Sequence, residues 1–467
     1  MTLMPTLIIP VENQVRELDP KLLLACVAAR RGFTSILGPH REIDFRIASL
    51  PRGLYLNKSM TARNLKMFQI MRRLGIPILT WDEEALVHLP PDIYYSRRLS
   101  PVAIGFLSHL FAWGEDNAEL WRRYPHFPAN LPIHITGNPR NDLMRPELRS
   151  YYEEDVRSLR DRYGDFFLIN TNFNHVNAFY PSQNLFQPLN HPEEEPKFGK
   201  AGVGMPRDYA LGLRDHKLAV FRSFQELIPK LSQAFPELSI IIRPHPTEGH
   251  DVYLKIASGN PRIQVTNEGN VVPWLLAAKA LIHNGCTTGV EAFVVGTPAI
   301  SYRAVVNEAY DSGFYLLPNR LSHQCFDQNQ IKEMLRQIVD GKMGPPDGVD
   351  PRSFVQRYLA ALDGPLACER MVAVLEQIST QAPTPPIPPL STRLLGMAAA
   401  NGRFLVKRFK SLFPGTHAPP EYHRHRYPRV TLEELRNRIG RFKTALRDET
   451  PVIAETLTNE IFRIRRG

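Results

Sequence analysis

The stretch LSIIIRPHP, residues 238–246, joins a run of apolar residues directly to an arginine and to a histidine between two prolines. The three isoleucines predict a buried strand. Pro244 and Pro246 lack a backbone N–H and fix the path of the chain as it leaves the sheet, so the His245 imidazole would project from a stiff support. The stretch therefore predicts a strand that carries a functional side chain at its carboxyl end.

The same strand pattern recurs along most of the chain. Strands are expected at residues 6–12, 33–39, 53–59, 76–84, 109–114, 133–137, 166–173, 238–246, 262–267, 278–285 and 297–305. Between them lie segments with helical spacing, such as 21–32 and 61–75, which both end in glycine. This alternation predicts an α/β fold of two Rossmann-like, doubly wound parallel-sheet domains with helices on both faces.

The expected domains are residues 1–142 and 143–380, which would leave a cleft at the carboxyl ends of both sheets, where ligands bind in such folds. Residues 181–206 show no periodicity and are expected to form a mobile loop in the second domain. Residues 381–390 contain five prolines and predict a linker. Residues 391–467 are expected to form a basic helical tail.

The tail holds 16 Lys and Arg against 7 Asp and Glu, a balance of +9 within a chain of net charge +10. An anionic surface is the partner that such a tail suggests, and a solvated tail is the alternative. One apolar stripe is more typical of a helix docked on protein: Leu432, Leu435, Ile439, Phe442 and Leu446. A second is better spaced for lying on a membrane: Leu405, Phe409 and Leu412 beside Lys407, Arg408 and Lys410.

Composition narrows the class of protein. The chain has 467 residues, 43% of them hydrophobic, which is enough for two cores. The four cysteines are far apart, so neither a disulfide framework nor a CxxC metal site is suggested, and a cytoplasmic location is expected. No leader or run of about 20 apolar residues is found. A nucleic-acid partner is disfavoured because the basic residues have few aromatic neighbours. A Rossmann dinucleotide cofactor is also disfavoured, because GxGxxG is absent from the first strand-helix turn.

A second chemical motif lies at residues 283–292, HNGCTTGVEA. It predicts a strand end, a tight turn and a helix start, where unpaired N–H groups and the helix dipole favour a phosphate. The candidate phosphate-binding residues of this turn are Gly285, Cys286, Thr287, Thr288 and Gly289. Glu291, one turn into the helix, could accept hydrogen bonds from ribose hydroxyls. The alternatives are that Thr287 only caps the helix and that Glu291 only faces the helix dipole.

Several short motifs, in their order along the chain, resemble those of a known family. The motifs are REL and LLLAC near the start, DEEA at 82–85, TGNPRND at 136–142, RPHP, and CTTGVEA at 286–292. They resemble the bacterial surface carbohydrate biosynthesis protein family and, more distantly, capsule-type Kdo transferases and HP-motif bacterial sialyltransferases. The resemblance implies a GT-B glycosyltransferase that takes an acidic sugar from a CMP-linked donor, inverts the anomeric centre, and needs neither a metal nor a cofactor. The implied acceptor is a glycan or a lipid-linked sugar.

The resemblance also implies roles for residues. Glu84, paired with Glu83, matches the acid that deprotonates the acceptor hydroxyl, although Ala85 stands where the relatives have glycine. His245 would bond the donor phosphate, with help from Arg243, Pro246 and the 285–289 turn. Further candidate contacts are Asn170, Thr171 and Asn172, and Glu17 and Asp19 are reserve acids in the loop after the first strand.

Two other functions stay open on the sequence. One is a relative of the non-hydrolysing UDP-sugar 2-epimerases, which share this fold and a strand-ending histidine but have a more acidic serine-glycine turn than CTTGVEA. The other is a non-catalytic module that binds a nucleotide sugar or a polysaccharide. Polar residues at three separate strand ends favour an enzyme over such a module.

Overall fold

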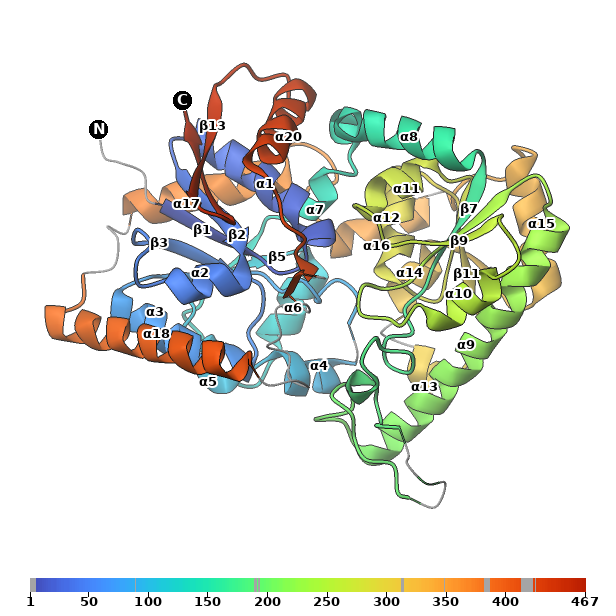
Figure 1. Cartoon of the computed structure of the whole chain (residues 1–467), viewed down its shortest axis with the longest axis horizontal. Coiled ribbons are helices and arrows are strands. Elements are labelled where there is room, and N and C mark those ends of the chain that lie inside the picture. The colour runs from blue at the N-terminus through green and yellow to red at the C-terminus, as the bar shows by residue number, and fades with distance from the viewer. Residues whose placement is uncertain are drawn as a thin grey trace. The chain divides into compact units, whose positions relative to one another are not determined.

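Figure 1 shows a computed structural model of the chain, which describes residues 6–88, 90–188, 191, 194–311, 315–347, 349–381, 387–412, 423–424 and 426–467. Contacts divide the chain into two units, each with its own sheet. Unit 1 comprises Met1–Leu86, Arg97–Tyr151 and Gln356–Gly467, and unit 2 comprises Val87–Ser96 and Tyr152–Val355. Unit 1 therefore includes the tail and part of the stretch that the sequence patterns assign to the second domain.

The sheet of unit 1 runs in the order β13-β14-β2-β1-β3-β4-β5-β6. Its strands are β1 (Thr6–Val11), β2 (Thr34–Pro39), β3 (Gly53–Asn57), β4 (Ile78–Thr80), β5 (His109–Ala112), β6 (Ile133–Ile135), β13 (Val452–Thr458) and β14 (Ile461–Arg466). Neighbours from β2 to β6 are parallel, whereas the β13–β14 hairpin joins β2 in antiparallel fashion. The direction of winding reverses between β1 and β3, and the carboxyl edge at such a switch point is where open α/β sheets bind ligands.

The helices of unit 1 cover both faces of this sheet. They are α1 (Gln14–Arg30), α2 (His40–Arg46), α3 (Leu65–Leu74), α5 (Pro101–Ile104), α6 (Glu115–Arg122), α7 (Pro139–Asp142), α17 (Ala367–Gln381), α18 (Leu390–Lys410) and α20 (Leu432–Ala445), with short turns η1 (Ala62–Asn64) and η2 (Pro146–Tyr152). α3 ends as predicted at Gly75, whose φ of 72° favours glycine. α1 begins earlier than expected, so Glu17 and Asp19 lie in a helix and not in a loop.

The sheet of unit 2 is parallel throughout, in the order β12-β11-β10-β7-β8-β9. Its strands are β7 (Phe166–Asn170), β8 (Ser239–Arg243), β9 (Ile263–Val265), β10 (Ala280–His283), β11 (Ala299–Tyr302) and β12 (His323–Cys325). β7 starts the sheet, β8 and β9 extend it on one side, and β10 to β12 extend it on the other. The switch point therefore lies between β7 and β10, which is the strand order of a dinucleotide-binding sheet.

Helices and an apolar core complete unit 2. They are α4 (Pro91–Arg98), which ends in unit 1, α8 (Glu153–Tyr163), α9 (Arg207–Ala234), α10 (Asp251–Ala257), α11 (Val271–Ala277), α12 (Thr287–Val295), α13 (Glu308–Asp311), α14 (Leu316–Arg320), α15 (Gln328–Val339) and α16 (Val349–Tyr358), with η3 (Pro181–Gln183). Phe224 and Leu227 of α9 pack in one buried cluster with Phe167 and Ile240 of the sheet. Burial of this kind is the main stabilising contribution to the unit.

The C-terminal stretch corrects the expectation of a wholly helical tail. Residues 452–466 form the β13–β14 hairpin, and β14 completes the sheet beside β2. On α20, Leu435, Ile439 and Phe442 are buried, and the Phe442 ring stacks on Tyr151 with 4.0 Å between centroids. The stripe of α20 is thus docked on its own protein, as the first alternative predicted.

Two further segments differ in detail from the sequence patterns. In the expected mobile loop, Leu185, Phe186 and Met205 are buried in a small apolar cluster with α9, and mobility itself stays a prediction. In the expected proline-rich linker, residues 382–386 lie outside the described residues, and α18 begins directly after Pro389. The four cysteines are buried and free.

Candidate functional site

The carboxyl edge of β7 and β10, at the switch point of unit 2, brings several predicted residues together. Asn170, Thr171 and Asn172 end β7, and Asn284 and Gly285 follow β10. The Asn172 N–H donates to Asn284 Oδ1 at 2.9 Å, and Asn284 Nδ2 donates to the Asn172 carbonyl at 3.4 Å. These reciprocal bonds lock the two strand ends side by side at the ligand-binding edge of the sheet.

His245 follows β8 and is half-buried. The backbone N–H of Thr247 donates to His245 Nδ1 at 3.3 Å, and the Thr247 hydroxyl lies 2.9 Å from the same nitrogen. Because a backbone N–H can only donate, Nδ1 is the acceptor, and the proton of the neutral ring lies on Nε2. The turn from His245 to Thr247 thus sets the tautomer in which Nε2 is a hydrogen-bond donor, as a phosphate oxygen would require.

Glu248 organises this turn, and the motif analysis did not identify it. It is 1% exposed, and its carboxylate accepts from the His245 N–H at 3.3 Å, the Thr171 hydroxyl at 3.0 Å and the Phe173 N–H at 3.1 Å. The Tyr253 hydroxyl and Asn177 also donate to it. Burial raises the pKa of Glu248, although these hydrogen bonds act against the increase. The sequence did offer a signal for Glu248, which is an acid two residues after His245-Pro246. A carboxylate at such a place can accept hydrogen bonds from the backbone of several loops.

The start of α12 forms the third part of this edge. Gly285 has a φ of 82° and lies so close to Tyr315 that a Cβ would fall 1.8 Å from its ring. The His283 ring accepts from the Gly285 N–H at Nδ1 and contacts Ser322 through Nε2, and burial lowers the pKa of His283 to about 3. His283 is therefore a neutral support of the turn that contains the candidate residues.

Thr287 and Thr288 lie in the first turn of α12, with Cys286 as the preceding cap residue, and Gly289 packs on His283. Among the described residues, the buried Thr288 Oγ1 and the buried Asn170 Oδ1 have no hydrogen-bond partner. Unsatisfied buried polar atoms are costly, and the contact of these two with a ligand stays a prediction. Glu291 is also buried in α12, but its contact with a ribose stays a prediction.

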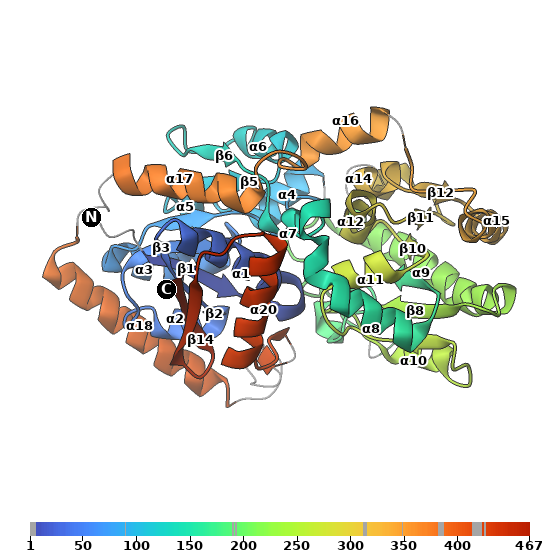
Figure 2. The ribbon, with the colours of Figure 1, turned by 90° about the horizontal axis from the view of Figure 1, so that it is seen from above.

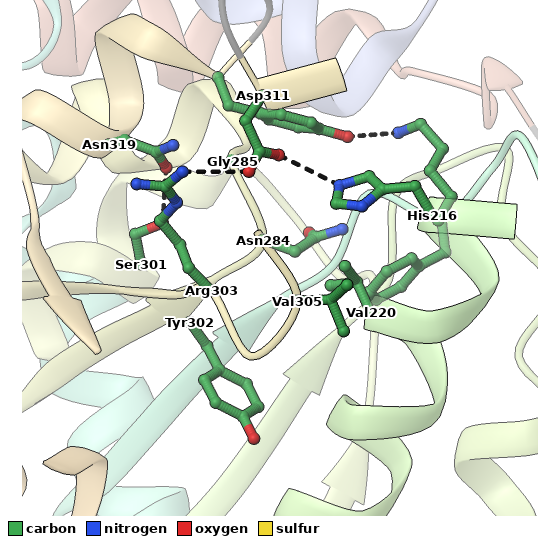
Figure 3. Close-up of a pocket in the computed structure, with 13 residues that line it drawn as sticks. His216, Val220, Asn284, Gly285, Ser301, Tyr302, Arg303, Val305, Asp311 and Asn319 are labelled. Carbon is green, nitrogen blue, oxygen red and sulfur yellow. Dashed lines mark hydrogen bonds and ion pairs between the residues drawn. The ribbon is translucent and has the colours of Figure 1, made fainter. Parts of the chain in front are cut away.

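A small polar cavity of about 20 Å³ lies behind the Gly285 turn (Figure 3). His216 lies 3.1 Å from Asp311, which also accepts from Arg303 at 3.0 Å, and Ser301 donates to Asn319 at 2.6 Å. Lys217 donates to the Tyr315 hydroxyl at 2.6 Å. Burial, opposed by the charges of Glu248 and Asp311, lowers the pKa of Lys217 to about 8. Lys217 thus adds a buried cation beside the turn, which sequence spacing gave no way of finding.

Arg243 has a different environment from the one expected. Its guanidinium donates to the carbonyls of Glu268 at 2.7 Å and Gly269 at 3.0 Å, and it stacks over the Trp274 ring at 4.6 Å. Burial lowers its pKa to about 9. These contacts support a structural role, in which Arg243 holds the loop after β9, and its contact with a donor phosphate stays a prediction. Pro246 lies in the His245 turn and supplies rigidity.

The predicted acids of unit 1 lie near the carboxyl edges of β1 and β4. Glu17 is buried and accepts from Lys21 at 2.7 Å and Lys58 at 3.2 Å. Burial would raise the pKa of Glu17, but these two cations and the Glu12 N–H hold it well below its ordinary value. A carboxylate of this kind is a poor proton acceptor, so these contacts support a structural role for Glu17 at the switch point.

Glu83 and Glu84 differ in their surroundings. Glu83 is buried, accepts from Trp81 Nε1 at 2.8 Å and lies 3.8 Å from Lys21. The Glu84 side chain is 52% exposed and lies 3.4 Å from Arg16. Glu84 is thus the accessible member of the pair, which suits a base that must meet an acceptor.

Ala85, which stands where the resembling families have glycine, does not disturb the turn after Glu84. Ala85 is not among the described non-glycine residues with a positive φ, so the turn has no need of glycine there. Groups of three or more His, Cys, Asp or Glu side chains placed to hold a metal ion are absent from the described part of the chain. Independence from metal stays a prediction.

Comparisons with known proteins give information on the fold. No family model and no curated protein matches the chain. A histidine-to-alanine variant of the wall teichoic acid polymerase TagF matches with a TM-score of 0.50 and 10% identity, over 81% of this chain and 90% of that one. UDP-GlcNAc 2-epimerase from Methanocaldococcus jannaschii, with UDP-GlcNAc and UDP, has a TM-score of 0.44 and 13% identity, over 79% and 99%. MnaA from S. aureus, with UDP, has a TM-score of 0.45 and 12% identity, over 81% and 97%.

The TagF match and the strand orders confirm the predicted α/β fold, a GT-B fold of two Rossmann-like parallel-sheet units. The resemblance to Kdo transferases and sialyltransferases is not tested by these structures.

Proposed function

We propose that the protein is an inverting, metal-independent glycosyltransferase. It moves an acidic sugar of the Kdo or sialic-acid kind from a CMP-sugar donor to a glycan or lipid-linked acceptor, during synthesis of a bacterial surface polysaccharide or glycoconjugate. Peripheral contact with an anionic membrane belongs to this proposal, because a lipid-linked acceptor would be held there. The observation that carries the proposal is the carboxyl edge of the sheet in unit 2, where a His245 Nε2 donor and the start of α12 follow the two strands that flank β7.

In the proposed reaction, the acceptor hydroxyl gives its proton to Glu84 while its oxygen bonds to the anomeric carbon. The bond from that carbon to the donor phosphate breaks, and CMP leaves with the electron pair. The His245 Nε2–H and the Thr288 hydroxyl donate to the phosphate, so the charge that develops on the leaving group meets fixed donors. Attack from the face opposite to the leaving group inverts the centre.

Thermal unfolding with free nucleotides tests the donor. CMP in excess is expected to raise the melting temperature, because a ligand that binds only the folded state stabilises it. UDP is expected to have a smaller effect. A shift with UDP and none with CMP would replace this proposal with an epimerase-like enzyme, and the absence of any shift would favour a module that does not use nucleotides.

His245→Ala tests the mechanism. Release of CMP from a CMP-linked acidic sugar is expected to fall about 10² to 10⁴-fold, which is the range for loss of a positioned proton donor. The fold should survive, since the His245 side chain is only half-buried. His126→Ala, an exposed histidine of unit 1, is the matched control and should turn over normally. Equal turnover in both variants would remove His245 from the reaction.

A further inference from the structure

The solvent side of α18 is unusually apolar for a protein surface. Seven large apolar side chains on it, or just beyond its end, are each more than half exposed: Leu390, Leu394, Leu395, Leu405, Val406, Phe409 and Leu412. Leu394 and Leu405 are eleven residues apart, as are Leu395 and Val406, and eleven residues make about three helical turns. These residues therefore share one side of the helix, which we term the outer face. Contiguous apolar surface of this kind marks an interaction site.

The opposite side of α18 is fixed to unit 1, so the outer face cannot turn inward. α18 lies against α2 and α3 (Figures 1 and 2). Gly396 packs so closely on α3 that an added Cβ would lie 3.0 Å from Arg73 Cβ. The Phe404 ring meets the Phe45 ring edge-on at 5.1 Å, and Arg403 donates to Asp44 at 3.2 Å. A helix held in this way presents the outer face to whatever approaches unit 1.

Charge identifies the chemistry of the partner. Residues 387–412 contain no Asp or Glu, and their five cationic residues are Arg393, Arg403, Lys407, Arg408 and Lys410. Arg408 and Lys410 are exposed next to Phe409. Burial and the neighbouring charges of Arg403 and Lys410 lower the pKa of Lys407, although the carboxylate of Asp44 acts against the decrease. An apolar stripe on a segment that contains cations and no carboxylates of its own matches an anionic lipid surface, where acyl chains and phosphates lie together.

We propose that the outer face of α18 inserts in the plane of an anionic membrane interface. None of the described helices combines the length and apolarity needed to cross a bilayer. This inference rests on the membrane contact included in the proposed function and names the surface that makes it. It is independent of the donor sugar and of the chemical step.

Co-sedimentation of the full chain with vesicles tests the inference. Binding is expected to equimolar phosphatidylglycerol and phosphatidylcholine, and to be much weaker with phosphatidylcholine alone. Leu405→Ser with Phe409→Ser should weaken binding at least about tenfold, because two large apolar side chains no longer enter the interface. Arg408→Gln and Lys410→Gln should each weaken it about fivefold, with a smaller effect at high salt.

Leu254→Ser is the matched control, since Leu254 is also a leucine more than half exposed, on α10 of unit 2. It should bind vesicles as the unchanged protein does, and CMP release with a soluble acceptor should be equal in all these variants. Vesicle binding that survives Leu405→Ser with Phe409→Ser would overturn the inference. The inference would also be overturned if the protein did not bind vesicles and instead self-associated through Leu405 and Phe409, because the outer face would then bind a second copy of the chain. Failure of the CMP experiment leaves vesicle binding unaffected, so the two proposals fail separately.

Discussion

Lys217 combines burial with a charge that the fold does not need. The fully buried ammonium loses its hydration, which lowers its pKa from 10.5 to about 8. With a depressed pKa, the neutral form is favoured by folding, so stability is greatest above pH 10.5 and decreases as the pH falls through about 8. At pH 7 this costs on the order of 3 kcal/mol. Proteins keep such groups mainly where a ligand uses the charge.

Lys217→Met should therefore separate stability from binding. At pH 7 the variant is expected to resist denaturant better than the unchanged protein, because methionine fills similar volume without a buried charge. This gain should shrink by pH 10, and the CMP-induced rise in melting temperature should fall. Lys230→Met, an exposed position on α9, is the control and should change neither property. A variant that is less stable at pH 7 but keeps the full CMP shift would show that Lys217 serves packing only.

The first turn of α12 joins a helix start to a buried hydroxyl. Thr288→Val keeps the shape of the side chain and removes Oγ1, which has no partner among the described residues. Stability without ligand should stay equal or rise by about 1 kcal/mol, because an unsatisfied buried group is lost. CMP affinity, measured by calorimetry, should fall about tenfold, as expected for one hydrogen bond to a charged phosphate.

The control for this helix is Thr380→Val on α17, where the hydroxyl donates to the carbonyls of Glu376 and Gln377 in the same helix. It should leave CMP affinity unchanged. If Thr288→Val destabilised the protein without affecting CMP, Thr288 would be a helix cap, as the simpler interpretation of the sequence holds.

The polypeptide does not end in a separable tail. β14 covers the edge of β2, and Arg438 of α20 binds Asp19 of α1. Arg426 also donates to Glu12 at 2.5 Å, in the ion cluster around Lys58 at the switch point of unit 1. Deletion of residues 391–467 is therefore expected to unfold unit 1, because it exposes a sheet edge and removes the arginine partners of Asp19 and Glu12.

Limited proteolysis tests this expectation. The shortened chain should yield a resistant fragment from unit 2 and rapid cleavage within residues 6–86, with aggregation during expression. The matched control is the full chain with Leu405→Ser and Phe409→Ser, which should resist protease like the unchanged protein. A soluble shortened chain with a normal melting transition would show that the hairpin and α20 are accessory. If the shortened chain is unfolded, its loss of membrane binding would report the unfolding and not the loss of a lipid contact.

Local patterns accounted for most of the fold. Several strands and one helix end depend only on residues close together in the sequence, and the sequence shows these directly. They are the apolar runs at β1, β2, β3, β7, β8, β10 and β11 and the glycine that ends α3. The β13–β14 hairpin was missed although Phe462 and Ile464 alternate with Arg463 and Arg465 as in a strand, because the surrounding charges also suit an amphipathic helix. Glu17 was placed in a loop because nothing local showed where α1 begins.

The sequence alone was enough for the α/β class, for the position of His245 at a strand end and for the threonines at a helix start, since each depends on residues within one turn or one strand. The partners of those residues depended on tertiary structure. Glu248 gathers donors from two loops and from α10, Lys217 reaches Tyr315 across 98 residues, and α20 rather than α18 buries its apolar stripe. Contacts between distant segments form only when a sheet has assembled, because strand order brings together residues that sequence spacing keeps apart.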